Sequence, residues 1–257
     1  MLYQIKQYVK FLLKSTNQHG VHSPFVYDLV TKCFYNKSGF EDYEKLRQYR
    51  GKLLKNKSNI AVTDLGAGSK ITKNKTRVIS NIAKHVSSTK HRTALLYRLV
   101  NYFKNESILE LGTSLGISTQ AMSLGNPNAK ITTIEGCPNI SKLSKESFYQ
   151  QGLENIEVLT GDFAEIIKNL EHNTYDLIFF DGNHQKEATL NYFETLLPTI
   201  NNDSVLIFDD IYWSKGMTEA WEIIKQHPKV TVSIDTFYWG LVFFRKEQVK
   251  EHFTVRV

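Results

Sequence analysis

The residues most able to do chemistry are acids that follow short apolar runs. Asp181 begins an Asp-Gly-Asn-His segment after one such run, and Asp209 and Asp210 follow the next. Because the carboxyl ends of parallel strands meet at one edge of a sheet, these carboxylates are expected to converge. Converging carboxylates repel one another unless a cation lies among them, and Mg²⁺ or Ca²⁺ prefers oxygen ligands. Asp181, Asp209 and Asp210 are therefore a candidate metal site, unless one or two of them cap helices or bind buried backbone.

His184 lies three residues beyond Asp181, near the same expected edge. An imidazole titrates close to neutral pH and can take a proton from a substrate hydroxyl. His184 is therefore the candidate base, with Asp181 beside it as the second catalytic candidate. A surface or supporting role for this histidine is an equal alternative.

A second group of candidates surrounds a glycine-spaced turn. Glu110, Gly112 and Gly116 follow a Glu-x-Gly-x-x-x-Gly spacing, and a helix-like segment comes next. Glycines let the backbone approach a ligand closely, and a helix N-terminus offers free N–H groups. The pattern predicts a nucleotide-like cofactor in an α/β sheet, but it does not meet the Gly-x-Gly-x-x-Gly spacing of dinucleotide sites.

Acids at the next two strand ends would complete such a site. Glu135 comes 23 residues after Gly112, where an acid can accept hydrogen bonds from both ribose hydroxyls. Asp162 could accept from an adenine amino group with Phe163 against the ring, although Asp162 is also typical of a helix N-cap. A similar glycine-containing stretch at 62–69 has no second strand and no acid after it, and we interpret it as a structural or substrate-side loop.

Short apolar runs alternate with amphipathic helices through the second half of the chain. This predicts an α/β fold with a doubly wound, mostly parallel seven-stranded sheet and helices on both faces. The last two strands leave no room for a crossover helix, so the final strand should be antiparallel. The expected strands cover residues 108–111, 130–135, 156–159, 175–180, 204–208, 230–235 and 239–244.

The first part of the chain reads differently. We expect residues 1–95 to form a helical N-terminal cap or substrate region and residues 96–257 to form the cofactor-binding domain. One helical face over residues 2–14 should pack on the main domain or, alternatively, bind a membrane surface. That face carries Leu2, Ile5, Val9, Leu12 and Leu13. His19 and His22 have the right type for metal ligands, but no nearby residue completes a set, so a structural loop is the better interpretation.

Charge is distributed unevenly along the chain. The 257 residues carry a net charge of +6, yet residues 1–100 hold 19 Lys and Arg against 5 Asp and Glu. This basic part is either a solvated surface or a docking site for nucleic acid or anionic headgroups. Two cysteines cannot build a disulfide framework, and no apolar run is long enough to span a membrane. We therefore expect a cytoplasmic protein without integral membrane association, with a homodimer left open.

Taken together, these residues resemble the class I S-adenosylmethionine-dependent methyltransferases, in particular the cation-dependent enzymes similar to catechol O-methyltransferase. The resemblance covers residues 95–245. It implies that Ser118 binds the methionine carboxylate, that Glu135 binds the ribose, and that Asp181, Asp209 and Asp210 bind the metal. The cofactor-binding residues it implies are Glu110, Gly112, Thr113, Ser114, Gly116, Ser118, Glu135, Gly136, Asp162, Phe163 and Asp181.

The resemblance is less direct at the base. Catechol enzymes carry a lysine where this chain has His184, and a related group acting on sugars and antibiotics has Asp-Gly-Asp or Asp-x-x-His there. The acidic base of that group would fall on Asn183, which cannot accept a proton. The implied function is O-methylation of a small-molecule hydroxyl, assisted by Mg²⁺ or Ca²⁺. The alternatives are a metal-free methyltransferase of RNA or protein, docked by the basic N-terminal region, and a non-catalytic cofactor-binding protein.

Overall fold

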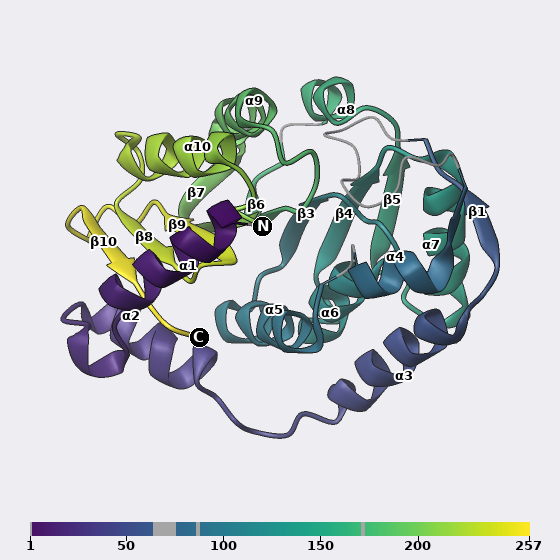
Figure 1. Cartoon of the computed structure of the whole chain (residues 1–257), viewed down its shortest axis with the longest axis horizontal. Coiled ribbons are helices and arrows are strands. Elements are labelled where there is room, and N and C mark those ends of the chain that lie inside the picture. Colours follow the sequence, from purple (N-terminus) through teal and green to yellow (C-terminus); the bar gives the residue numbers. More distant parts are fainter. Residues whose placement is uncertain (1, 64–75, 86–87, 171–172) are drawn as a thin grey trace. The chain divides into compact units, whose positions relative to one another are not determined.

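The structure is a computed structural model and describes residues 2–63, 76–85, 88–170 and 173–257 (Figure 1). The chain forms two compact units, which we call unit 1 (Met1–Asn36 with Leu170–Val257) and unit 2 (Lys37–Asn169). Most of the loop interpreted at 62–69 lies outside the described residues. The two units do not follow the expected boundary at residue 95, and the role of residues 1–95 as a substrate cap stays a prediction.

Three parallel strands form the sheet of unit 2, in the order β3 (Ser107–Leu111), β4 (Lys130–Glu135) and β5 (Ile156–Thr160). The apolar side chains of β3 and β4 are buried, as expected for parallel strands covered on both faces, whereas in β5 Val158 is buried and Ile156 and Leu159 are half-buried. The register pairs Glu110 with Thr133 and Glu135 with Thr160. The acids of interest therefore lie at or next to the carboxyl ends of their strands.

Each strand of unit 2 is followed by a helix: α6 (Ile117–Gly125), α7 (Pro138–Gln150) and α8 (Phe163–Asn169). Three further helices precede the sheet, namely α3 (Asp42–Lys55), α4 (Ile79–His85) and α5 (Lys90–Phe103), and α5 packs against α6. The region over residues 1–95 that was expected to be helical also contains two short strands. Two three-residue strands, β1 (Asn59–Ala61) and β2 (Thr76–Val78), pair antiparallel there and are too short to show a period-two pattern.

The strands of unit 1 lie in the order β10, β8, β9, β7 and β6. The predicted runs become β6 (Tyr175–Phe180), β7 (Ile200–Asp209), β8 (Val232–Asp235) and β9 (Trp239–Phe243), and β9 is antiparallel to both neighbours, as predicted. The predicted fold class is confirmed, but the count of seven strands was one too low. An additional strand, β10 (Glu251–Thr254), pairs parallel with β8, and its polar composition with one buried residue, Phe253, hides it in the sequence.

Two helices follow the central strands of unit 1, namely α9 (Lys186–Leu196) after β6 and α10 (Lys215–Gln226) after β7. A 3₁₀ turn at Leu197–Thr199 leads from α9 into β7. Ser214 caps α10, because its Oγ accepts a hydrogen bond from the Met217 N–H at 3.1 Å. Both helices therefore begin directly after the loops that carry the aspartates.

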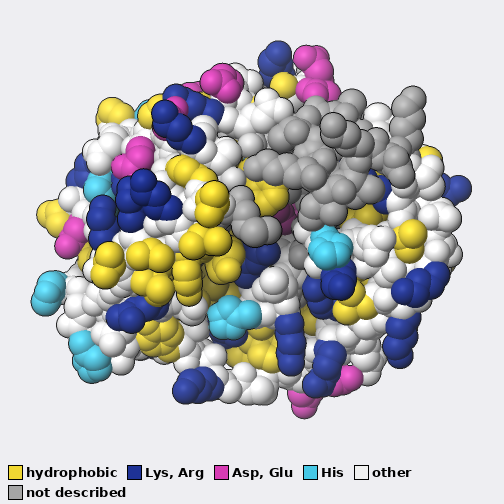
Figure 2. Space-filling view, in the orientation of Figure 1, with side chains coloured by type: hydrophobic (Ala, Val, Ile, Leu, Met, Phe, Trp, Pro, Cys, Tyr) yellow, Lys and Arg dark blue, Asp and Glu magenta, His cyan; other side chains and the backbone are white. Residues whose placement is uncertain are grey.

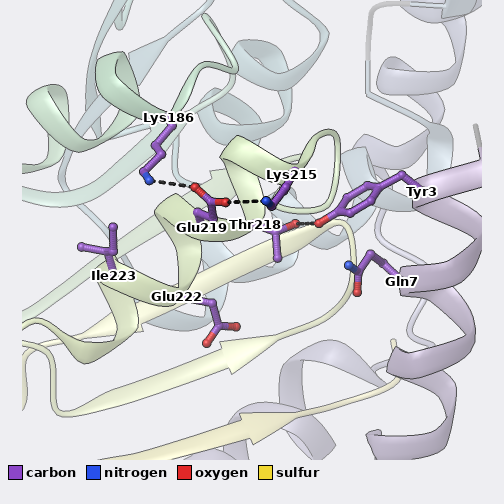
Figure 3. Close-up of a pocket in the computed structure, with 8 residues that line it drawn as sticks. All are labelled: Tyr3, Gln7, Lys186, Lys215, Thr218, Glu219, Glu222 and Ile223. Atoms are coloured by element: carbon purple, nitrogen blue, oxygen red, sulfur yellow. Dashed lines mark hydrogen bonds and ion pairs between the residues drawn. The ribbon is translucent and has the colours of Figure 1, made fainter.

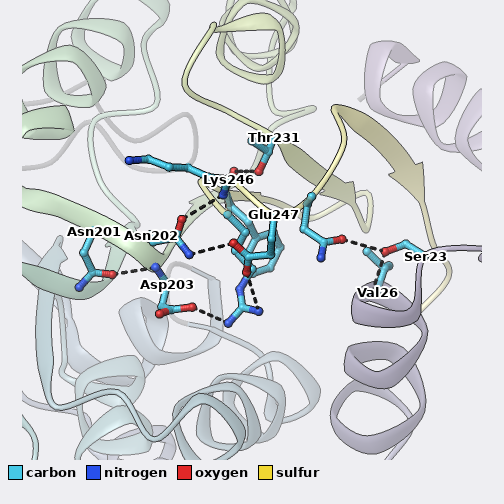
Figure 4. Close-up of polar contacts among 11 residues, drawn as sticks. Ser23, Val26, Asn201, Asn202, Asp203, Thr231, Lys246 and Glu247 are labelled. Carbon is cyan, nitrogen blue, oxygen red and sulfur yellow. Dashed lines mark hydrogen bonds and ion pairs between the residues drawn. The ribbon is translucent and has the colours of Figure 1, made fainter.

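The N-terminal segment of unit 1 packs beside the C-terminal strands. It contains α1 (Leu2–Lys14), a 3₁₀ turn (Gln18–Gly20), α2 (Pro24–Asp28) and a π-helical turn (Leu29–Phe34). Ser23 caps α2 by accepting from the Val26 N–H (Figure 4), and its hydroxyl donates to Gln248. Phe25 packs edge-on against Phe243 beneath the Arg245 guanidinium. His19 lies in the 3₁₀ turn and His22 in the short link to α2, and neither joins a group of metal-ligand type among the described residues.

The first helix packs on unit 1 through a different face from the one expected. Phe11 is buried, its ring centroid lies 5.6 Å from that of Phe237, and the Tyr3 hydroxyl donates to Thr218 Oγ1 at 2.8 Å. The face with Leu2 and Leu13 is exposed instead. Within the described part of the chain, no helix has the length and apolar character needed to cross a bilayer.

Candidate functional site

The glycine turn after β3 has the backbone conformation that its sequence demands. Gly112 and Gly116 have φ values of 112° and 73°, and Ser114 between them also has a positive φ of 48°. Gly116 is the N-cap of α6, and a Cβ there would lie 2.4 Å from the Phe148 ring, so no larger residue fits. The turn is therefore strained at one non-glycine position, a feature that concentrates at ligand sites.

Glu135 closes this turn from the end of β4. Its Oε2 accepts from the Ser114 N–H and its Oε1 from the Cys137 N–H, both at 2.8 Å. A carboxylate offers about four acceptor positions, so two backbone bonds leave acceptor capacity on each oxygen. Glu135 is half-buried and fixed in direction, which suits an acid that binds two neighbouring hydroxyls.

Glu110 lies beneath the turn rather than on its surface. Its side chain is fully buried, and its Oε2 accepts from Thr119 at 2.5 Å and from Thr133 at 2.6 Å. Burial raises the pKa of this carboxyl from 4.5 to about 8, against the opposing effect of the two hydroxyl hydrogen bonds, and the charge of Glu135 adds to the rise. Its Oε1 accepts no hydrogen bond from the described residues. A neutral Glu110 therefore ties β3, β4 and α6 together under the turn.

The other predicted cofactor residues divide into buried and accessible positions. Thr113 and Ser118 are buried and bond to Thr133 and Ser88, at 2.6 and 3.0 Å between hydroxyl oxygens. Gly136 is half-buried between β4 and α7. Asp162 is exposed and caps α8, because its Oδ1 accepts from the N–H groups of residues 164 and 165. Phe163, the first residue of α8, is half-buried. The N-cap interpretation of Asp162 is thus confirmed, and its role in binding the cofactor stays a prediction.

In unit 1, the structure gathers Asp181, His184 and Asp209. One ligand atom from each lies within 4.8 Å of the other two, and they form a group of metal-ligand type at the ends of β6 and β7. Asp209 is buried, while Asp181 and His184 are half-buried. Two carboxylates with one imidazole match the donors that Mn²⁺ and similar divalent cations accept. The group shares Asp181 and Asp209 with the predicted ligand set, and it contains His184 where the prediction has Asp210.

Asp210 does not belong to that group. It adopts a left-handed backbone conformation with a φ of 53°, and its carbonyl accepts from the Trp213 N–H at 2.8 Å. The residue therefore turns the chain out of β7 toward α10. Its assignment as a metal ligand stays a prediction.

Two residues outside the predicted site, Trp239 and Asn183, support the group. The Trp239 indole Nε1 donates to Asp209 Oδ1 at 2.7 Å, because the antiparallel register places the two residues opposite each other. Asn183, with a φ of 51°, donates from Nδ2 to the Tyr192 hydroxyl at 3.0 Å and so ties the Asp-Gly-Asn-His loop to α9. The contact between Trp239 and Asp209 depends on the strand register, which cannot be read from the sequence alone.

Tyr212, two residues after Asp210, packs inside unit 1. The Tyr212 hydroxyl donates to Asp235 Oδ2 at 2.5 Å, and its ring stacks on Phe237 at 5.2 Å between centroids. Burial and the negative charge of Asp235 raise the pKa of this phenol. Tyr212 therefore belongs to the packing of unit 1 and fixes the loop that leaves β7.

A pocket of about 490 Å³ opens on unit 1 between α1 and α10 (Figure 3). Lys186 and Lys215, the first residues of α9 and α10, both approach Glu219, at 2.8 and 3.7 Å. Because these charges are paired, the pocket presents no strong field of one sign. The remaining lining residues are Tyr3, Gln7, Thr218, Glu222 and Ile223.

Comparison with known proteins agrees with this geometry. Residues 109–211 match a family described as a methyltransferase domain. A putative O-methyltransferase of Mycobacterium sp. (strain JLS) is 28% identical over 92 residues, and a protein-L-isoaspartate O-methyltransferase of Methanococcus maripaludis (strain C5) is 30% identical over 90 residues. Each match covers 35% of this chain and 42% of the relative, so the chain spans less than half of their length.

Solved structures extend the likeness to most of the chain. A methyltransferase of Podospora anserina with bound SAH superposes with a TM-score of 0.63 at 17% identity, covering 88% of this chain and 97% of that one. The O-methyltransferase TomG of Streptomyces achromogenes, in complex with SAM, gives a TM-score of 0.58 at 16% identity and covers 84% and 95%. Residues 109–211 therefore match a methyltransferase-domain family, and the chain has the α/β fold of these solved methyltransferases.

Proposed function

We propose that this protein transfers a methyl group from S-adenosylmethionine to a hydroxyl of a small molecule with the help of a divalent cation. The observation that carries the proposal is the grouping of Asp181, His184 and Asp209 within 4.8 Å of one another, in a chain with a methyltransferase domain. Three ligand-type groups gathered at two strand ends favour a shared cation.

The residues of unit 2 fit the methyl donor. Glu135 retains acceptor capacity for the two ribose hydroxyls, and Asp162 keeps one oxygen beyond its cap bonds. The positive-φ turn from Gly112 to Gly116 brings backbone close to the space before α6. When bound there, the donor supplies an electrophilic sulfonium methyl.

In unit 1, the chain's own groups orient the acceptor. Asp209 is fixed by the indole of Trp239 on one oxygen, so the other can bind a cation together with Asp181. A cation in this group would lower the pKa of an acceptor hydroxyl and fix its oxygen. His184 is placed to complete the ligand set or to accept the hydroxyl proton. Transfer then requires the acceptor oxygen to meet the sulfonium methyl in line, which is mainly a matter of alignment.

The proposal is tested with the full chain, labelled S-adenosylmethionine and a panel of catechols, hydroxycinnamoyl esters and sugars. We expect label transfer to at least one small acceptor, with loss of transfer in EDTA and recovery on adding Mg²⁺ or Mn²⁺. Transfer that continues unchanged in EDTA, or that goes only to RNA or to protein, would overturn the proposal and favour the macromolecular alternative.

Glu135→Gln is expected to weaken S-adenosylhomocysteine binding by about 10- to 100-fold, since a charge-assisted hydrogen bond is worth about 1.5–3 kcal/mol. The amide keeps the size of the side chain but can no longer accept from both the Ser114 and Cys137 N–H groups and two ribose hydroxyls. Titration calorimetry measures the dissociation constant. The matched control is Glu157→Gln, an exposed residue of β5, for which wild-type affinity is expected. Unchanged affinity in Glu135→Gln would remove this residue from the donor site.

His184→Gln separates the two roles of the histidine. If His184 is a ligand, Mn²⁺ affinity should fall by about 10- to 100-fold together with turnover. If it is the base, turnover should fall by about 10²- to 10⁴-fold while Mn²⁺ affinity stays, and the limb of the pH–rate profile near neutral pH should vanish. Because three groups lie within 4.8 Å, we expect the ligand result. Retention of both affinity and turnover would exclude His184 from the site.

A further inference from the structure

The first helix leaves an apolar surface uncovered. We define the apolar face of α1 as Leu2, Ile5, Val9, Leu12 and Leu13, whose exposed fractions run from 41% at Leu12 to 86% at Leu2. Figure 2 shows hydrophobic side chains gathered where Figure 1 draws α1. At 100° per residue these side chains span an arc of about 100°, which Tyr8 extends to about 140°. Such a contiguous exposed apolar patch marks an interaction surface.

This exposure does not come from a detached helix. Three side chains hold α1 in place within unit 1: Phe11 is buried, Tyr8 at the edge of the apolar face packs on Phe237 with ring centroids 4.8 Å apart, and Tyr3 donates to Thr218. The helix is therefore docked in a fixed orientation with its apolar face outward. Tyr238, next to Phe237 in the β8–β9 turn, is also 52% exposed and adds an amphipathic ring to the same side of unit 1.

The charges of α1 indicate what kind of partner covers its apolar face. Lys6, Lys10 and Lys14 are all exposed and lie on one side of the apolar face, about 20°, 60° and 100° beyond Leu13 at 100° per residue, and the helix contains no acid. If two copies paired their apolar faces through antiparallel helices, the lysine borders would meet without an acid in α1 to compensate them. An anionic lipid surface satisfies both features at once, because acyl chains take the apolar face while lysine side chains reach the headgroups.

We propose that α1 docks the protein on an anionic lipid surface, with its apolar face at the headgroup–acyl boundary. This inference is independent of the proposed methyl transfer, since α1 carries none of the residues assigned to donor, cation or proton. It also differs from a membrane span, because only one face of the helix is apolar.

The test is co-sedimentation of the full chain with vesicles of phosphatidylcholine alone or with 30 mol% phosphatidylglycerol. We expect binding only to the anionic vesicles, decreasing as salt rises. Val9→Gln with Leu13→Gln should weaken binding at least about 10-fold, and glutamine at Lys6, Lys10 and Lys14 should weaken it about 100-fold. Glutamine is a good helix former, so α1 should persist in both variants, as circular dichroism would verify.

Matched control variants carry the same changes elsewhere. Tyr149→Gln with Val249→Gln alters residues that are 88% and 77% exposed, and glutamine at Lys45, Lys142 and Lys168 removes three exposed charges from unit 2. Both controls should bind vesicles as the wild type does. No binding to anionic vesicles, or equal binding to neutral ones, would overturn the proposal. So would a dimer seen by light scattering that the α1 variants dissociate while vesicles are not bound, because the occupant would then be a second copy.

Discussion

Replacing Asp209 by asparagine is expected to weaken Mn²⁺ binding by at least about 100-fold and to leave S-adenosylhomocysteine binding unchanged. The substitution removes a charged ligand atom from the group of Asp181, His184 and Asp209. An asparagine Oδ1 still accepts from the Trp239 indole, so the buried hydrogen bond at 2.7 Å is retained. The loss should therefore report on the cation and not on the fold.

Titration of Mn²⁺ followed by electron paramagnetic resonance measures this loss, and calorimetry with S-adenosylhomocysteine measures the donor site. Asp203→Asn, on the exposed part of β7, is the matched control and should bind Mn²⁺ normally. Asp210→Asn distinguishes the two ligand sets: the resemblance implies a loss as large as that of Asp209→Asn, whereas the observed grouping implies a smaller one. In either case Asp210→Ala is expected to lose turnover and keep the methyl donor. Wild-type Mn²⁺ affinity in Asp209→Asn would remove the cation from the proposal.

Glu110→Gln is expected to change how stability depends on pH. The folded-state pKa of Glu110 is about 8 against 4.5 for an ordinary glutamate, so the folded chain binds one more proton than the unfolded chain between these values. Wild-type stability should accordingly be highest at the acidic end of that window and fall by ~1.4 kcal/mol per pH unit as pH rises toward 8. The glutamine variant lacks this loss, since its amide oxygen can still accept from Thr119 and Thr133.

Urea unfolding at pH 5, 6, 7 and 8 measures the effect as the difference in unfolding free energy between variant and wild type. That difference should grow with pH in favour of the variant, by a few kcal/mol over the window. Glu157→Gln, at an exposed position of β5, should show a constant difference. Parallel curves for Glu110→Gln and wild type would show that Glu110 is ionised in the folded protein.

The fold was predictable where one segment's own residues decide its structure. The apolar runs that became β3 to β9 announce buried strands, and the tight connection before β9 requires an antiparallel partner. Strand β10 escaped because a polar edge strand needs only one buried side chain. The face of α1 was misjudged for a related reason: the sequence shows that the helix is amphipathic, but Phe11 rather than the larger apolar face finds the partner Phe237.

The sequence predicted which residue types occupy the candidate site better than it predicted the contacts between them. Asp181 and Asp209 were assigned from their strand ends, and the structure brings them together. His184 joins them because the left-handed residue Asn183 folds the loop back, and the sequence alone does not reveal that conformation. The Trp239 bond to Asp209 depends on a register between residues 30 positions apart.

The two units differ in how the chain builds them. Unit 2, which carries the donor turn, is one continuous stretch, whereas unit 1 combines the two ends of the chain. Thr16 pairs with Val255, and its backbone N–H donates to the Thr254 carbonyl at 2.9 Å. During synthesis, all of unit 2 is therefore made before the C-terminal strands with which the N-terminal segment packs. The group of Asp181, His184 and Asp209 belongs to the unit that is finished last, so a nascent chain completes the proposed donor turn before the proposed cation site.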